Sequence, residues 1–229
     1  MGINVSMSSV HLDVKQELSE KGFVFIPRWK LELSINELAS NVGKVVKISD
    51  YLNHSMIPDV QKVTPKERES SIKSHYSGEF GLNAFPLHTD LAHWGKPPKY
   101  IMMRCINGNE RVATKVLPLN IIWEILQDHG LRRAVVKTRG RRCCLLPLLF
   151  NTNEEQCIRW DSHFLEPVNE SASVIRDLML SKKVWDLAID IKLKNFGDTL
   201  ILNNHSHFHG RSKVSSDCVD RELERIYFN

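Results

Sequence analysis

The sequence predicts a mainly β protein with peripheral helices (α+β), folded as a double-stranded β-helix, or jelly roll. Two observations predict this fold. Short runs rich in β-branched and aromatic residues recur along most of the chain, and only a few stretches with helical spacing interrupt them. No repeat and no linker rich in glycine, proline or serine divides the 229 residues, so we expect one domain over residues 1–229.

The first 50 residues predict two helices and two short strands. Leu12, Val14 and Leu18 lie roughly at helical spacing ahead of Gly22, and a second helical stretch ends at Gly43. In chain order we expect a helix over 11–21, a strand over 23–26, a helix over 35–42 and a strand over 44–48.

Residues 49–80 show no periodicity. They are polar, carry many charges and contain Pro58, Pro65 and Gly78. A segment of this length without a regular pattern predicts either disorder or a functional loop, here a lid over a site.

The pattern is mainly β from Phe85 onward. Runs typical of strands occupy 100–105, 112–117, 142–150, 157–160, 186–193, 199–203 and 223–228. Two helical stretches, 119–128 and 169–181, interrupt them. Many short strands with few helices are typical of a jelly roll.

Composition indicates a cytoplasmic protein. No run approaches the roughly 18 apolar residues of a membrane span, and the N-terminus lacks the pattern of a secretory signal. An odd number of cysteines without CxxC spacing argues against disulfides and a thiolate zinc site; they are Cys105, Cys143, Cys144, Cys157 and Cys218. The net charge of +4 is too small to predict nucleic-acid binding.

The segment Phe85-Pro86-Leu87-His88-Thr89-Asp90 carries the first candidate metal ligands. On a strand, residues two apart face the same side, so His88 and Asp90 would project together. An imidazole and a carboxylate are two thirds of the 2-His-1-carboxylate set that leaves open positions on Fe(II). The alternative is a surface or hydrogen-bonded histidine, because His-x-Asp recurs by chance.

The third ligand is expected far along the chain, in the histidine-rich run before Arg211. His205, His207 and His209 share one face of a regular strand, so periodicity leaves all three open. Gly210 predicts a chain reversal directly after His209, and this turn favours His209 as the residue at the strand end.

Two arginines follow at positions that suit a carboxylate clamp. A hairpin folding near Ser215 would place Arg221 opposite His209, with Cβ atoms about 5 Å apart. Arg225 shares that face, about 13 Å further along the strand. A buried guanidinium binds a carboxylate through two hydrogen bonds; the alternative is a surface ion pair with Glu222 or Glu224.

With these residues the chain resembles the taurine dioxygenase and clavaminate synthase-like family of Fe(II)/2-oxoglutarate-dependent oxygenases. The resemblance runs over most of the length. Its segments include 18–26, 85–91, 97–100, 159–161, 167–170, 197–198, 203–204, 209–211 and 220–221. The chain is short for that family, and the loop after His-Gly-Arg lacks the usual aromatic and proline residues.

The resemblance implies the roles of the site residues. It assigns the metal Fe(II) to His88, Asp90 and His209, the distal carboxylate of 2-oxoglutarate to Arg221 and Thr114, and the primary substrate to Arg225. It implies a dioxygenase that consumes O2 and 2-oxoglutarate. The products would be succinate, CO2 and an oxidised, most simply hydroxylated, small molecule such as an amino acid or a related anionic metabolite.

Further candidates remain open at this point. Asn83, Phe85, Trp94 and Arg159 could line the substrate pocket, whereas His93 with Trp94 could equally form a packed aromatic contact. A basic stretch between Arg132 and Arg142 is more typical of a solvated face than of a nucleic-acid site. The competing functional class is a cupin-like metal-binding jelly roll without oxidative turnover, which would have no need of the Arg221 clamp.

Overall fold

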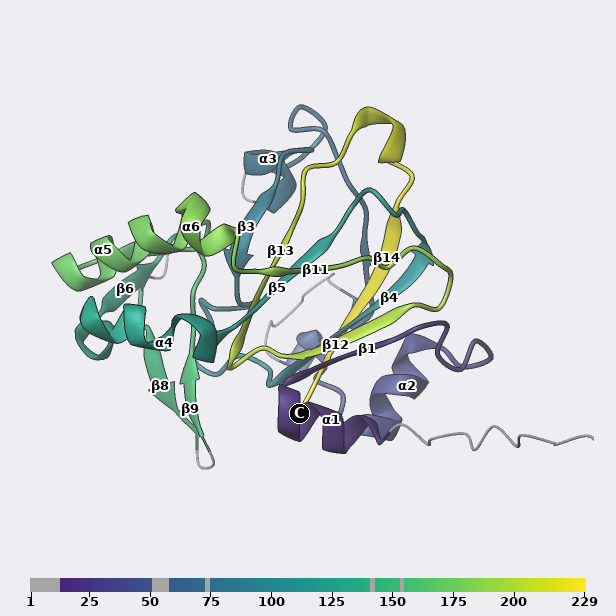
Figure 1. Ribbon diagram of the computed structural model, residues 1–229, viewed down its shortest axis with the longest axis horizontal. Coiled ribbons are helices and arrows are strands. Elements are labelled where there is room, and N and C mark those ends of the chain that lie inside the picture. Colours follow the sequence, from purple (N-terminus) through teal and green to yellow (C-terminus); the bar gives the residue numbers. More distant parts are fainter. Residues whose placement is uncertain (1–12, 51–57, 73–74, 141–142, 153–154) are drawn as a thin grey trace, which may run out of the picture.

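The protein is described here by a computed structural model that covers residues 13–50, 58–72, 75–140, 143–152 and 155–229. Two antiparallel sheets dominate it (Figure 1). The first has the order β1-β12-β4-β14-β2, and its strands are Phe23–Ile26, Thr199–Asn203, Tyr100–Asn107, Glu222–Phe228 and Gln61–Val63. The second has the order β11-β5-β13-β3, and its strands are Ile189–Ile191, Thr114–Pro118, His207–Arg211 and Phe85–His88.

Alternating side chains of the five-stranded sheet divide between two apolar clusters. Residues such as Ile101, Leu200 and Tyr227 share one buried cluster with Val116 and Ile191 of the four-stranded sheet. This cluster joins the two sheets, as expected for half-buried strands whose side chains alternate in direction. The sheets therefore enclose a common interior, toward which the odd-numbered residues of β14 point.

The other face of the five-stranded sheet is covered by the N-terminal helices, α1 (Val14–Lys21) and α2 (Ile35–Val42) (Figure 1). The Asp13 carboxylate caps α1, which ends at Gly22 in a left-handed conformation (φ 72°). Ser34 and Glu37 form a capping box at the start of α2.

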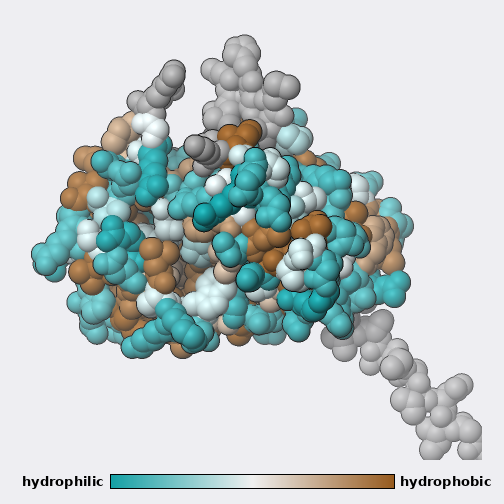
Figure 2. Space-filling model, turned by 90° about the horizontal axis from the view of Figure 1, so that it is seen from above, coloured by the Kyte–Doolittle hydropathy of each residue, from teal (hydrophilic) through white to brown (hydrophobic). Residues whose placement is uncertain are grey.

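A second apolar core lies beside the four-stranded sheet, where α4 (Leu119–Asp128), α5 (Glu170–Met179) and α6 (Lys182–Trp185) gather (Figure 1). The remaining strands are β6 (Val135–Thr138), β7 (Leu145–Pro147), β8 (Leu149–Asn151), β9 (Gln156–Ile158) and β10 (Leu165–Pro167). Short 3-10 turns occupy Ile48–Asp50, Leu131–Arg133 and Ser216–Cys218. On the face shown in Figure 2, hydrophilic residues predominate and the hydrophobic ones lie scattered among them.

Most elements agree with the sequence prediction. The structure confirms the strand 23–26, the helices 35–42 and 119–128 and the strand 199–203, and it places the first helix at Val14–Lys21. Positions 11 and 12 of that predicted helix lie outside the described residues. Mostly β sheet with a few helices is therefore the observed fold class.

Several predicted elements differ in extent from the observed ones. The strand 112–117 is observed at Thr114–Pro118 and the strand 157–160 at Gln156–Ile158. The strand 44–48 is reduced to one bridge, Val45 with Phe228, because the Asp59 carboxylate binds the Ile48 amide and turns the chain. Position 142 of the predicted strand 142–150 lies outside the described residues, and the rest divides into β7 and β8 at Leu148, whose amide donates to the Ala134 carbonyl. The strand 186–193 shortens to β11, while 169–181 ends as a helix at Met179.

The segment 49–80 contains regular structure that the sequence did not predict. β2 pairs with β14, and a helix, α3 (Tyr76–Phe80), follows. Positions 51–57 and 73–74 of the segment lie outside the described residues. No helix in the described ranges has both the length and the apolar character needed to cross a membrane.

Candidate metal centre

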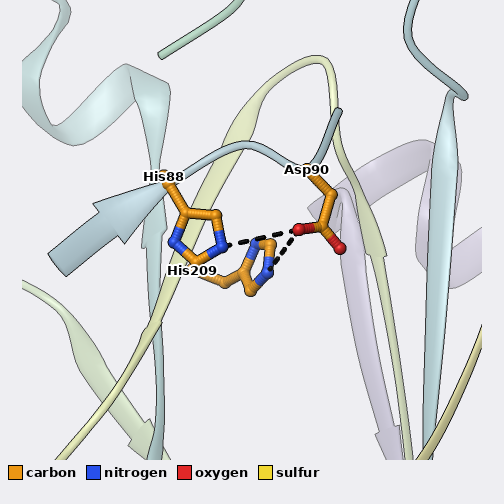
Figure 3. Close-up of side chains that lie close together, drawn as sticks. All are labelled: His88, Asp90 and His209. Carbon is orange, nitrogen blue, oxygen red and sulfur yellow. Dashed lines mark ion pairs between the residues drawn. The ribbon is translucent and has the colours of Figure 1, made fainter. Parts of the chain in front are cut away.

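Three predicted ligands meet at one end of the four-stranded sheet (Figure 3). His88 ends β3, Asp90 lies in the turn that follows, and His209 is paired with His88 across β13 and β3. Oδ1 of Asp90 is 3.5 Å from Nε2 of His88 and 3.8 Å from Nε2 of His209. All three residues are at most 5% exposed, and one ligand atom from each lies within 4.8 Å of the others.

The turn at Asp90 is held by a residue that the sequence prediction did not single out. The Asn204 side chain accepts a hydrogen bond from the Asp90 amide at 2.7 Å and donates to the Asp90 carbonyl at 2.9 Å. The His-x-Asp spacing suggested that both residues lie on one strand, but β3 ends at His88 and Asp90 lies beyond it. It reaches the same point because Asn204 fixes the turn after β3.

The two carboxylate oxygens of Asp90 have different partners. Oδ2 accepts hydrogen bonds from Nη1 of Arg225 at 2.8 Å and from the Tyr227 hydroxyl at 2.9 Å, which leaves Oδ1 facing the imidazoles. Burial would raise the pKa of Asp90, but the charge of Arg225 and the bond to His88 outweigh it and hold the pKa far below its ordinary value. Asp90 is therefore an ionised carboxylate with one oxygen free for a cation.

The two imidazoles point their Nε2 atoms toward the same Asp90 oxygen. Nδ1 of His88 lies 2.8 Å from the Pro86 carbonyl and donates to it, which leaves Nε2 facing Asp90. Burial lowers the pKa of His88, but the hydrogen bond to Asp90 outweighs it and raises the pKa, so a bound cation would take the place of the Nε2 proton. Burial and the neighbouring His88 lower the pKa of His209 to about 3, so this imidazole is neutral. Neutral imidazole nitrogens and one carboxylate oxygen are the donor set of non-haem Fe(II), and the buried residues fit that ion.

His209 occupies this position for a different reason from the predicted one. Gly210 is a strand residue within β13, so the chain does not reverse there. A Cβ at Gly210 would lie 2.7 Å from the Phe85 carbonyl, and glycine therefore permits the close approach of β3 and β13. The other two histidines lie elsewhere: the His205 ring contacts Pro97, and the His207 ring contacts Phe23.

Arg221 and Thr114 also come together, although the predicted hairpin was wrong. β13 and β14 belong to different sheets, and the chain crosses between them through the turn Ser216–Cys218. Arg221 nevertheless donates to the Thr114 hydroxyl at 3.4 Å across the interior. Thr114 lies two residues from Val116, the partner of His209, and thus about 7 Å further along β5.

The Arg221 guanidinium is a buried charge without a carboxylate partner among the described residues. Its side chain is 2% exposed, and burial lowers its pKa to about 10. Burial also lowers the pKa of the half-buried Arg211 to about 10, and the charge of Arg221 adds to that effect, so a second cation lies near Arg221. A buried charge is costly unless an anion accompanies it, so Arg221 is a candidate anion-binding residue.

Arg225 faces the interior as expected, but its guanidinium is engaged by protein groups. Besides Asp90, it donates to Oε1 of Gln61 on β2 at 2.5 Å. The sequence prediction missed Gln61 and Tyr227. Only Tyr227 had a signal in the pattern, since it is two residues after Arg225 on the same face of a strand.

Aromatic and acidic groups cover the His88 side of the cluster. The ring of Tyr76, on α3, lies 4.7 Å from that of His88, and its hydroxyl donates to Asp161. Three residues further along α3, Glu79 is paired with Nδ1 of His163. These four residues were not predicted as site residues; Asp161 lies in the segment 159–161 that carries the resemblance, whereas Tyr76, Glu79 and His163 come from segments without a recognisable pattern.

The remaining predicted pocket residues have structural contacts. Phe85 stacks on Tyr76 and lies under the Arg211 guanidinium, while Asn83 is exposed and its carbonyl accepts a bond from Arg211. Arg159 donates to the carbonyls of Ala92, Trp94 and Gly95, so it fixes the turn after Asp90. Trp94 packs against the apolar cluster between the sheets.

Comparison with solved structures identifies the fold. No family model matches the sequence. Asparagine oxygenase in complex with Fe(II), 2S,3S-3-hydroxyasparagine and succinate matches with a TM-score of 0.61 and 20% identity, over 75% of this chain and 56% of that one. The non-haem iron oxygenase OrfP with Fe and α-ketoglutaric acid gives 0.59 and 21%, over 84% and 62%.

PvcB from Pseudomonas aeruginosa, whose structure is also described as that of an Fe, α-ketoglutarate-dependent oxygenase, matches over more of both chains. The TM-score is 0.67 at 14% identity, over 94% of this chain and 78% of that one. This chain thus spans little more than half the length of asparagine oxygenase but most of the length of PvcB. The chain has the fold of the Fe(II)- and 2-oxoglutarate-dependent non-haem oxygenases, as its sequence resemblance predicted.

Proposed function

We propose that this protein is an Fe(II)- and 2-oxoglutarate-dependent dioxygenase that oxidises a C–H bond of a small molecule. The observation that carries the proposal is the pairing of two sites: a buried cluster of two histidines and one carboxylate, and a buried arginine without a described counter-ion. We also propose that the two sheets form a double-stranded β-helix and that residues 1–229 make one domain, which agrees with their shared apolar core.

His88, Asp90 and His209 would hold the metal. Bound Fe(II) would supply the oxygen chemistry that couples decarboxylation of 2-oxoglutarate to substrate oxidation, with succinate and CO2 as products. The protein groups orient the ligands: Arg225 and Tyr227 fix one oxygen of Asp90, and the Pro86 carbonyl fixes the His88 ring. These hydrogen bonds hold the side chains of Asp90 and His88 in the orientation in which they would bind the metal.

Arg221 and Thr114 would bind the distal carboxylate of 2-oxoglutarate. The guanidinium offers paired donors to a carboxylate, and the threonine hydroxyl offers a third. The spacing along β5 suits a five-carbon dicarboxylate, because Thr114, which Arg221 contacts, lies two residues beyond the partner of His209. The bound dianion would also neutralise the buried charge of Arg221.

The substrate is proposed to be an amino acid or a related small molecule. Two of the similar structures contain hydroxylated amino acids, 2S,3S-3-hydroxyasparagine and (3S)-hydroxy-L-Arg. Glu79 and Asp161 place carboxylates on the side of the cluster covered by Tyr76, where they suit a substrate amino group. Arg225 is engaged by Asp90 and Gln61, so we propose that it orients the metal ligand rather than binding substrate alone.

Anaerobic spectroscopy tests the proposal. Protein reconstituted with Fe(II) and 2-oxoglutarate should develop the visible charge-transfer band of the chelate. His88→Ala should abolish the band and Arg221→Ala should weaken it strongly, whereas the exposed Arg132→Ala should leave it intact. A band absent from the native protein despite bound Fe(II) would contradict the proposal and favour a metal-binding protein without oxidative turnover. With substrate panels and O2, succinate should form only when all three ligands are present.

A further inference from the structure

A second group of metal-ligand side chains lies where the β8–β9 hairpin, which is visible in Figure 1, meets the turn between β12 and β13. This group is separate from the cluster that would bind iron. Glu155 directly precedes β9, and Cys157 lies on it. His205 lies in the turn that links β12 to β13. The Ile158 amide donates to the His205 carbonyl at 2.8 Å, so the hairpin is held against that turn. One ligand atom from each of the three side chains lies within 4.8 Å of the others.

Two buried atoms at this point, Nδ1 of His205 and Oε1 of Glu155, make no hydrogen bond to the described residues. His205 is 3% exposed, and its Nε2 donates to the Pro97 carbonyl at 3.0 Å, so Nδ1 carries the lone pair. Nδ1 faces Oε1 of Glu155 at 3.5 Å, and neither atom has a hydrogen-bond partner among the described residues. Oε1 of Glu155 also forms an ion pair with Nζ of the partly exposed Lys99 at 3.3 Å. A buried imidazole nitrogen and a carboxylate oxygen that face each other are two of the ligands of a cation site.

We propose that Glu155, Cys157 and His205 form a second metal site that binds Zn(II). Thiolate, imidazole and carboxylate together are typical Zn(II) ligands, whereas a thiolate is foreign to the donor set of His88, Asp90 and His209. Oγ1 of Thr152 lies 3.9 Å from the Cys157 sulfur, so this hydroxyl or a water supplies the fourth ligand. The Pro97 carbonyl orients the imidazole, as outer partners of zinc-binding histidines do.

Lys99 competes with the metal for Glu155. Its Nζ lies 3.3 Å from Oε1 of Glu155, and its side chain is partly exposed, so it can withdraw to solvent when a cation binds. Glu155 also lines a surface cavity of about 540 Å³, which gives a metal ion a route to the site. The proposal does not depend on the oxygenase function, because the two groups share no residue.

Cobalt substitution tests the site through the sulfur ligand. Metal-free protein titrated with Co(II) should develop an intense near-ultraviolet thiolate-to-cobalt band whose final amplitude corresponds to one thiolate-bound Co(II) per chain, in addition to the Co(II) that the first cluster binds. Cys157→Ser should abolish this band, and Cys218→Ser, at another buried cysteine, should retain it. His88→Ala should also retain it, because the first cluster contains no thiolate.

Two further variants test the proposed zinc site independently, in case Cys157→Ser does not fold. His205→Gln keeps the thiolate but should weaken Zn(II) binding at least tenfold in a chelator competition. Lys99→Ala removes a nearby positive charge and should tighten it about fivefold. Native protein without the band, or a band unchanged in both Cys157→Ser and His205→Gln, would overturn the proposal.

Discussion

At the scale of single residues, the distinctive feature is the unequal use of the Asp90 oxygens. Arg225 and Tyr227 bind Oδ2, so the carboxylate cannot rotate without losing two hydrogen bonds. Such outer contacts commonly change metal affinity as much as a weak ligand does. Arg225, which the resemblance assigned to the substrate, is therefore hydrogen-bonded to Asp90 inside the protein.

We expect Tyr227→Phe to lower the affinity for Fe(II) or Mn(II) by roughly tenfold, because it removes one hydrogen bond to Asp90 and preserves packing. Arg225→Gln should have a larger effect, since it removes the charge that keeps Asp90 ionised. Metal titration followed by calorimetry measures both. Tyr100→Phe, on the outer side of the sheet, serves as the control; equal affinities in all variants would remove Arg225 and Tyr227 from the positioning role.

Arg221→Met should make the ligand-free protein more stable by about 1–4 kcal/mol, because an apolar side chain replaces a buried charge. The same variant should lose the rise in Tm that 2-oxoglutarate with Mn(II) produces in the native protein. Thermal unfolding with and without the co-substrate measures both effects. A variant that is less stable and still stabilised by 2-oxoglutarate would contradict the anion site.

At the scale of elements, the meeting of β3 and β13 builds the cluster. The two strands approach so closely that only glycine fits at position 210, opposite the Phe85 carbonyl. His88 and His209 face each other because of this approach, and their ring centroids are 4.3 Å apart. The geometry of the site thus depends on a residue that carries no side chain.

Gly210→Ala should destabilise the protein by roughly 1–3 kcal/mol, because its Cβ would overlap the Phe85 backbone. It should also weaken metal binding, since β3 must shift and carry His88 with it. Gly95→Ala is the matched control, as a Cβ there meets nothing within 4 Å. Denaturant unfolding and metal titration of both variants provide the comparison; a harmless Gly210→Ala would show that the strands can separate freely.

The sequence could predict the elements whose signals are local. Helix α2 has a capping box and a terminal glycine, and β12 is a continuous apolar run, so both were predicted with correct bounds. The routes between sheets could not be predicted. Nothing near Ser215 indicates that β13 and β14 join different sheets, and the pairing of β2 with β14 depends on contacts distant in sequence.

The candidate site also contains some residues that could be predicted from local sequence signals and others that could not. His88, Asp90 and His209, with Arg221 and Thr114, could be chosen from spacing and resemblance. Asn204 and Gln61 could not, because each acts through hydrogen bonds to a residue more than 100 positions away. Tertiary contacts of that kind leave no periodic trace in a sequence.

At the scale of the whole molecule, the proposed iron site and the proposed 2-oxoglutarate site both draw residues from the two large sheets. The metal cluster comes from the four-stranded sheet and the turn after β3, and its anchors Arg225 and Tyr227 come from the five-stranded sheet. Arg221 and Thr114 face each other from the two sides of the interior. A bound dicarboxylate would therefore hold both sheets together.

Hydrogen exchange should reveal this bridging. With Mn(II) and 2-oxoglutarate, exchange should slow in β5 around Thr114 and at the start of β14, beyond the protection that Mn(II) gives alone. The exposed end of α5 provides an internal reference. Protection confined to the peptides that contain His88 and His209 would contradict a co-substrate that spans the interior.

The position of β14 has a consequence for biosynthesis. This strand is encoded late yet lies between β4 and β2, and it supplies the counter-charge of Asp90. A growing chain on the ribosome therefore exposes the edge of β4 and holds an uncompensated carboxylate until residues 222–228 have emerged. We therefore expect the proposed metal site to reach its full affinity only after β14 has inserted.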